Sequence, residues 1–169
     1  MKILFIVAVC LCVGSLPAEA QRKVESKSFN TLLKIMLSHN VKEITVPEVI
    51  SKKNMVFLDA REKNEYDVSH IKNAFFIGYK NFNVQSLQHV DKGKELIVYC
   101  SIGKRSEDIT QKLNMAGYTN VKNLYGGIFE WVNQGNEVVD TNNNKTSKVH
   151  VYGRLWGRWL NKGEKVYNN

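Results

Sequence analysis

Residues 96–117 constrain the fold of this chain most, because they predict a strand, a cysteine-containing loop and a helix in direct succession. Residues 96–99 are continuously apolar, which is typical of a strand buried in a parallel sheet. Apolar residues then recur at helical spacing before a glycine that ends the helix: Ile109, Leu113, Ala116 and Gly117. Cys100 is therefore expected at the carboxyl edge of a parallel sheet, where open α/β folds place their functional sites.

The loop CSIGKRS, residues 100–106, predicts a site for a negatively charged sulfur. Backbone N–H groups at the start of a helix have no helical partners, so they can point toward an anion inside the loop. The helix dipole and the cations of Lys104 and Arg105 add positive potential, which favours a thiolate over a thiol. We therefore interpret Cys100 as a nucleophile, against the alternative of a buried structural cysteine.

This loop resembles the active-site loop of the single-domain rhodaneses, which are thiosulfate sulfurtransferase-like enzymes that form a persulfide. Other signatures of that family follow in order and at fitting distances: LDAR at 58–61, EY at 65–66, SHIKNA at 69–74, and YGG at 125–127 before Trp131. The resemblance covers residues 45–137 and is to an exported bacterial type. The family usually has glycine at the positions of Ser69 and Asn73, but asparagine tolerates a left-handed backbone, so the turn is expected to survive.

The alternation of expected strands and helices indicates an α/β fold, with a mostly parallel central sheet covered by helices on both faces. The resemblance implies the same single rhodanese-like domain. We expect strands over 55–58, 74–77, 96–99 and 121–124, and helices over 32–37, 62–67 and 128–133. A further short helix is expected to begin at a capping box at Thr45–Glu48. The expected divisions are a signal peptide (1–20), an N-terminal helical extension (21–44), the rhodanese domain (45–137) and a C-terminal extension (138–169).

The opening segment has the parts of a secretory signal peptide: a basic start, an apolar run over 3–13 and the small-residue cleavage site AEA at 18–20. Cleavage there removes Cys10 and Cys12 and leaves Cys100 as the only thiol, without a partner for an internal disulfide. The alternative is a lipoprotein cleaved just before one of the two early cysteines. We expect an exported protein, periplasmic in a Gram-negative bacterium and otherwise secreted.

The resemblance implies that the Cys100 thiolate attacks a small anionic sulfur donor such as thiosulfate, and that a thiol or cyanide-like acceptor later removes the sulfur. A protein acceptor is a further candidate. We expect the loop residues to bind the donor and the anionic sulfur: Ser101, Ile102, Gly103, Lys104 and Arg105. The planar fork of Arg105 is suited to orienting the loop or the donor, while Lys104 either attracts the donor at the pocket mouth or is an ordinary exposed lysine.

Supporting roles are expected for four residues around the loop. Asp59 and Arg61 follow a neighbouring strand, and the resemblance implies a structural ion pair rather than a catalytic one. His70 is interpreted as a bridge between loops, because a thiolate of low pKa needs no general base. Ser106 is interpreted as a cap of the following helix. The reaction needs no cofactor, and the histidines show no spacing typical of a metal site.

Two other functions remain as alternatives. Cysteine phosphatases place five residues between cysteine and arginine, whereas four lie between Cys100 and Arg105 here, so the tighter loop favours a single sulfur atom. The second alternative is a non-catalytic sulfur carrier or interaction module. The net charge of +8 suits small anionic substrates, and no nucleic-acid motif accompanies it, so no nucleic-acid partner is expected.

The C-terminal extension carries an amphipathic pattern with two tryptophans, Trp156 and Trp159. Together with Leu155 and Leu160 they would lie on one face of a helix that Gly163 ends. We expect this helix to pack onto the domain and bury both tryptophans. A surface for a partner protein and a basic aromatic face on a membrane are the alternatives.

Overall fold

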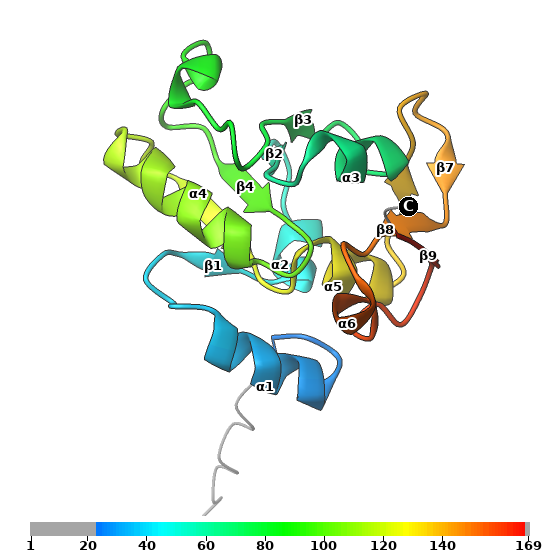
Figure 1. Ribbon diagram of the computed structural model, residues 1–169. Coiled ribbons are helices and arrows are strands. Elements are labelled where there is room, and N and C mark those ends of the chain that lie inside the picture. Colours follow the sequence, from blue (N-terminus) through cyan, green and yellow to red (C-terminus); the bar gives the residue numbers. More distant parts are fainter. Residues whose placement is uncertain (1–22, 168–169) are drawn as a thin grey trace, which may run out of the picture.

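The computed structural model describes residues 23–167, and the expected signal peptide (1–20) lies outside them. Its centre is a parallel sheet of five strands in the order β1-β5-β4-β2-β3 (Figure 1). The strands are β1 (Glu43–Ile44), β2 (Val56–Asp59), β3 (Phe75–Phe76), β4 (Leu96–Tyr99) and β5 (Val121–Leu124). The expected α/β class with a mostly parallel sheet is confirmed. Within residues 23–167, no helix is long and apolar enough to cross a bilayer.

Helices cover both faces of the sheet, as the continuously apolar strand β4 requires. Alternate residues of this strand enter two separate apolar clusters, one with Ile97 and Tyr99 and the other with Leu96 and Val98. The first cluster receives α1 (Lys27–Met36) and α5 (Gly127–Asn133), and the second receives α4 (Lys104–Met115). Two shorter helices, α2 (Val46–Ile50) and α3 (Lys63–Val68), and the 3₁₀ turn η1 (Val84–Leu87) complete the connections.

Several local sequence signals appear in the structure as expected. The capping box forms, with the Glu48 carboxylate accepting from the Thr45 amide at 2.8 Å. Asn73 adopts a left-handed backbone with φ of 62°, which explains why asparagine can replace glycine there. Ser69 has φ of −171°, an extended conformation that any residue adopts, so glycine is not needed at that position.

Both extensions pack onto the sheet domain. The ring of Phe29 from α1 stacks on Trp159 with 5.5 Å between centroids, and both tryptophans of the C-terminal extension are half-buried against the core. The extension continues as the antiparallel pair β6 (Val138–Val139) and β7 (Lys145–Thr146), followed by β8 (Lys148–His150), α6 (Arg154–Gly157) and β9 (Glu164–Val166), with β8 parallel to β9.

The expected C-terminal helix is wrong in extent, because α6 has only one turn. The chain after it is held by Asn133, whose side chain donates to the Trp159 carbonyl at 2.9 Å and accepts from the Asn161 amide at 2.7 Å. Gly163 does not end the helix but leads into β9, with φ of +90°. These tertiary hydrogen bonds and the strand pairing replace the helical bonds that the apolar periodicity predicted.

The N-terminus of α5 holds the loop that follows β4. The amide of Ile128 donates to the Cys100 carbonyl at 2.9 Å, and the amide of Phe129 donates to the Ser101 carbonyl at 3.1 Å. Gly127 makes this approach possible, because its φ is +58° and a Cβ there would lie 2.3 Å from the Cys100 carbonyl oxygen. The loop and α5 therefore fit together only with glycine at this position.

We expect Gly127→Ala to lower the free energy of unfolding by about 3 kcal/mol, because it adds left-handed strain to a clash with backbone atoms that cannot move aside. Urea unfolding measures the change. Gly153→Ala is the matched control: its Cβ would meet nothing within 4 Å, so a change within about 0.5 kcal/mol is expected. Equal effects at the two glycines would contradict the proposed fit between the loop and α5.

Candidate active site

Cys100 lies between β4 and α4, at the carboxyl edge of the sheet as predicted. It is the one free cysteine among residues 23–167, and only 1% of its surface is exposed. The amide of Gly103 donates to its Sγ at 3.2 Å, so a backbone N–H points at the sulfur inside the loop. Gly103 itself is the N-cap residue of α4, and its φ of 110° lies in the region that favours glycine.

The base of α4 is tied to the neighbouring strand β5 through one asparagine. Asn123 donates to the Gly103 carbonyl at 2.9 Å, and its Oδ1 accepts from the Ser106 hydroxyl at 2.7 Å. The expectation that Ser106 caps the helix is therefore wrong. Gly103 occupies the cap position, and Ser106 lies inside the first turn, fully buried, where its hydroxyl fixes α4 against β5.

Arg105 orients the loop through a bidentate ion pair with Glu65 of α3. The two guanidinium nitrogens lie 2.6 and 2.8 Å from the carboxylate oxygens. The Ser101 hydroxyl joins the pair, donating to Glu65 at 3.2 Å and lying 3.0 Å from Arg105. Of the two alternatives for the Arg105 fork, the structure thus shows it directed to the loop and to α3. Glu65 was part of a sequence signature, but its link to Arg105 was not predicted.

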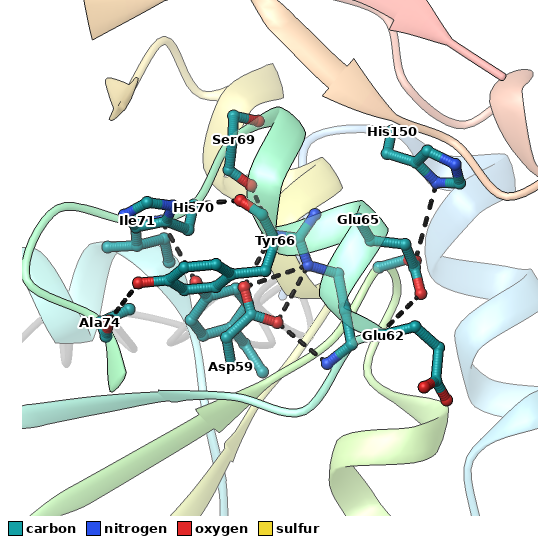
Figure 2. Close-up of polar contacts among 12 residues, drawn as sticks. Asp59, Glu62, Glu65, Tyr66, Ser69, His70, Ile71, Ala74 and His150 are labelled. Carbon is teal, nitrogen blue, oxygen red and sulfur yellow. Dashed lines mark hydrogen bonds and ion pairs between the residues drawn. The ribbon is translucent and has the colours of Figure 1, made fainter. Parts of the chain in front are cut away.

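Glu65 also faces the C-terminal extension. The Nδ1 of His150, from β8, lies 3.9 Å from the Glu65 carboxylate, and Figure 2 shows the two side chains directed toward each other. Burial by itself raises the pKa of Glu65, but the hydrogen bonds and charge of Arg105 outweigh burial and hold the pKa below its usual range. Glu65 is therefore a buried carboxylate that joins α3, the Cys100 loop and β8.

The predicted structural role of Asp59 and Arg61 agrees with their positions. Both are fully buried, and an Arg61 nitrogen lies 2.7 Å from the Asp59 carboxylate. The same nitrogen donates to the Ser69 carbonyl at 2.6 Å, which joins the end of β2 to the end of α3 (Figure 2). Neither residue lines the pocket over Cys100.

His70, interpreted from the sequence as a bridge between loops, contacts two segments and does not line the pocket over Cys100. Its ring stacks on Tyr66 with 3.9 Å between centroids, and its Nδ1 lies 3.1 Å from the Tyr66 carbonyl (Figure 2). Its backbone pairs with Val139, at the start of the C-terminal extension. Among the described residues, no group of three or more His, Cys, Asp and Glu is arranged to hold a metal ion.

A pocket of about 280 Å³ opens over Cys100. The predicted loop residues Ser101, Ile102, Lys104 and Arg105 line it together with Cys100. The other walls were not predicted from sequence, because they come from segments distant in the chain: Met36, Glu62, Tyr79, Lys80, Tyr152 and Trp156. The two tryptophans of the extension were expected in the core, and that expectation gave no sign that Trp156 would line the same pocket as Cys100.

Both alternatives for Lys104 describe part of its position. Its side chain lines the pocket and is 38% exposed, and its Nζ lies 3.1 Å from Glu107 and 3.8 Å from Asp108. Glu107 is buried, and its carboxylate also accepts hydrogen bonds from the backbone amides of Ser38 and His39. The Lys104 cation is therefore at the pocket but is already paired with carboxylates.

Residues 45–134 match the Rhodanese-like domain family, and this match covers more than half of the chain. The chain belongs to that family. Its solved neighbours share the fold: thiosulfate sulfurtransferase from Pseudomonas aeruginosa has a TM-score of 0.54 at 24% identity, over 70% of this chain and 23% of that one. The BH2092 protein from Bacillus halodurans has a TM-score of 0.50 at 21% identity, over 68% and 85% of the two chains.

Among curated proteins, the chain is similar to proteins named tRNA uridine(34) hydroxylase. The one from Yersinia pestis (strain Pestoides F) is 32% identical over 107 residues, which are 60% of this chain and 30% of the relative. The one from Buchnera aphidicola is 29% identical over 102 residues, 57% and 33% of the two chains. This chain therefore spans about a third of the length of the curated relatives it matches.

We expect Glu65→Gln to lower the free energy of unfolding by about 3 kcal/mol at neutral pH, because removing one partner of a buried ion pair leaves the other uncompensated. A group whose pKa is lowered in the folded state contributes stability that is full above its unfolded-state pKa, about 4.3. This contribution is lost as the pH falls through the lower folded-state pKa, so the difference between wild type and variant should shrink below about pH 4.

Urea unfolding from pH 3 to 7 measures both effects. Glu137→Gln is the matched control, because Glu137 pairs with Lys145 on the surface, where both side chains are mostly exposed. We expect that variant to change stability by less than about 0.5 kcal/mol. A difference for Glu65→Gln that is small at pH 7, or unchanged at low pH, would contradict the role given to this carboxylate.

Proposed function

We propose that the protein is a sulfurtransferase that carries a sulfane sulfur as a persulfide on Cys100. The observation that carries this proposal is the environment of Cys100, which is 1% exposed. Its Sγ accepts a hydrogen bond from the Gly103 amide, inside a loop with only four residues between Cys100 and Arg105. Such a cradle suits a single anionic sulfur atom and is small for a phosphate group. Membership of the rhodanese-like family supports the same chemistry.

The reaction divides into two displacements. The Cys100 thiolate attacks the outer sulfur of the donor, and with thiosulfate the bond between the two sulfur atoms breaks and sulfite leaves with the electron pair. The terminal sulfur of the resulting persulfide is anionic, so the loop amides and the positive end of α4 stabilise it. A thiol or cyanide-like acceptor then attacks that sulfur and restores the thiolate. Ping-pong kinetics follow from this sequence.

The activity named for the curated relatives is not carried over to this chain, since it matches only about a third of their length. A non-catalytic sulfur carrier remains the second candidate, and turnover separates it from the enzyme. The physiological donor and acceptor, a protein acceptor, membrane contact of the extension and the exported location stay predictions from sequence.

Cys100→Ser should abolish sulfur transfer while leaving the fold intact, because no other cysteine lies among residues 23–167. The measurement is the mass of the peptide containing residue 100 after incubation with thiosulfate, together with turnover to cyanide. Wild type should gain one sulfur atom on this peptide and turn over, and the variant should do neither. Phosphatase activity on the same preparations, or turnover by the variant, would contradict the proposal.

Arg105→Ala should lower the rate of transfer about ten- to a hundredfold, if its charge-assisted hydrogen bonds hold the loop with about 1.5–3 kcal/mol. Lys104→Ala should act more weakly and chiefly on the KM for thiosulfate, because the lysine is partly exposed and already paired. Its effect should fade at high ionic strength, where screening is stronger. Kinetics of both variants at low and high salt test this, and equal losses independent of salt would contradict the two roles.

A further inference from the structure

A segment outside the matched family region forms one wall of the pocket over Cys100. The match ends at residue 134, whereas Tyr152 and Trp156 lie on residues 151–163, which connect β8 to β9. Two parallel strands require such a crossover, since a tight hairpin cannot join them. The crossover that completes this strand pair also places two aromatic residues in the lining of the pocket that contains Cys100. In Figure 1, α6 lies beside α5, on which the loop after β4 rests.

Tyr152 is 56% exposed, and two contacts hold it at the pocket. Its amide donates to Nδ1 of His150 at 3.1 Å, and His150 is buried next to Glu65. Its ring lies under the guanidinium of Arg105, with 5.7 Å between the guanidinium carbon and the ring centroid. Trp156 is half-buried and packs against the first apolar cluster, the one that contains Ile97 and Tyr99. Both rings thus belong to the built wall of the pocket.

The remaining walls are also largely apolar. Met36 comes from α1, Ile102 from the loop and Tyr79 from the segment after β3. The Tyr79 hydroxyl donates to Asp108 at 2.9 Å, so its polar end is already occupied. A ligand that extends outward from Cys100 therefore meets side chains that favour an apolar, flat body.

The charges around the pocket are nearly balanced. Arg105 is paired with Glu65, and Lys104 with Glu107 and Asp108. Lys80 lines the pocket with no ion pair to any residue between 23 and 167, and Glu62 is another of the lining residues. A doubly charged donor would lose much of its hydration here for little positive charge in return, whereas a singly charged one loses less.

We infer that Tyr152 and Trp156 make this site selective for an organic donor that carries one negative charge and an apolar, preferably aromatic, body. This inference rests on the proposed sulfur transfer and names its donor class, of which an organic thiosulfonate is the simplest member. The Cys100 thiolate attacks the outer sulfur, the bond to the sulfonyl sulfur breaks, and the electron pair leaves with the sulfinate. One thiolate and one thiosulfonate thus become one persulfide anion and one sulfinate, and no proton or oxidant is involved.

The test compares benzenethiosulfonate with methanethiosulfonate on the full chain, since the two donors share the reacting group and the charge and differ in the body. The kcat/KM of each donor is divided by the rate constant for the reaction of that donor with a free thiol in solution. This ratio removes the difference in intrinsic reactivity between the two donors. We expect wild type to prefer the aromatic donor about tenfold or more, and Trp156→Ala to reduce this preference to less than about threefold.

Two further variants control the comparison. Tyr152→Asn removes the second ring and keeps a residue that tolerates the φ of 57° found there, so it should fold even if Trp156→Ala does not, and it too should lower the preference. Leu155→Ala alters a neighbouring side chain that is 73% exposed and does not line the pocket, so it should keep the wild-type preference. An unchanged preference in the two ring variants, or none in wild type, would overturn the inference.

Binding of the two product sulfinates separates this inference from the proposed function. Benzenesulfinate should bind wild type more tightly than methanesulfinate and should lose that advantage in Tyr152→Asn. If neither donor places sulfur on Cys100 but the sulfinates still show this difference, sulfur transfer is wrong and the selectivity of the pocket stands. If both donors react and the sulfinates bind equally, the transfer stands and the aromatic selectivity is wrong.

Discussion

The ion pair between Glu65 and Arg105 determines how the parts of this site fit together. Glu65 lies on α3 and Arg105 on the first turn of α4, and the carboxylate also accepts from Ser101 and faces His150 of the C-terminal extension. A charge buried to this extent is stable only when it is paired and hydrogen-bonded. The pair therefore fixes the loop around Cys100 between the sheet domain and the extension.

The same pair changes the electrostatic role of the loop. The carboxylate offsets part of the charge of Arg105, and backbone dipoles, namely the Gly103 amide and the N-terminus of α4, add positive potential at Cys100. These dipoles are fixed by the fold and need no side chain to move when the sulfur charge forms. The α5 amides hold the carbonyl groups of Cys100 and Ser101, which supports the loop in which the Gly103 amide donates to the sulfur.

Much of the fold could be predicted because its signals are local. The apolar run of β4, the capping box before α2 and the left-handed turn at Asn73 each depend on residues a few positions apart. The identity of Cys100 as the central residue followed from the same local order of strand, loop and helix. The family signatures added an expected sheet arrangement. The observed five-stranded sheet and the family match confirm the expected α/β class.

The parts that sequence reasoning missed depend on contacts between distant segments. Glu65 and Arg105 are 40 positions apart, and nothing in either segment names the other as its partner. The apolar periodicity of the extension predicted a longer helix, but side-chain hydrogen bonds from Asn133 and the pairing of β9 with β8 outweigh that periodicity. For the same reason Ser106 bonds to β5 rather than capping its own helix.

The crossover over residues 151–163 begins and ends at one strand pair, β8 and β9, beside the domain. It contacts the rest of the molecule through Tyr152, whose ring lies under the Arg105 guanidinium, and through Trp159, which stacks on Phe29. The cysteine loop and the two rings of the proposed donor selectivity thus lie in separate stretches of chain. Under the proposed selectivity, substitutions at Tyr152 and Trp156 would change the donor that is preferred and leave the sequence of the cysteine loop untouched.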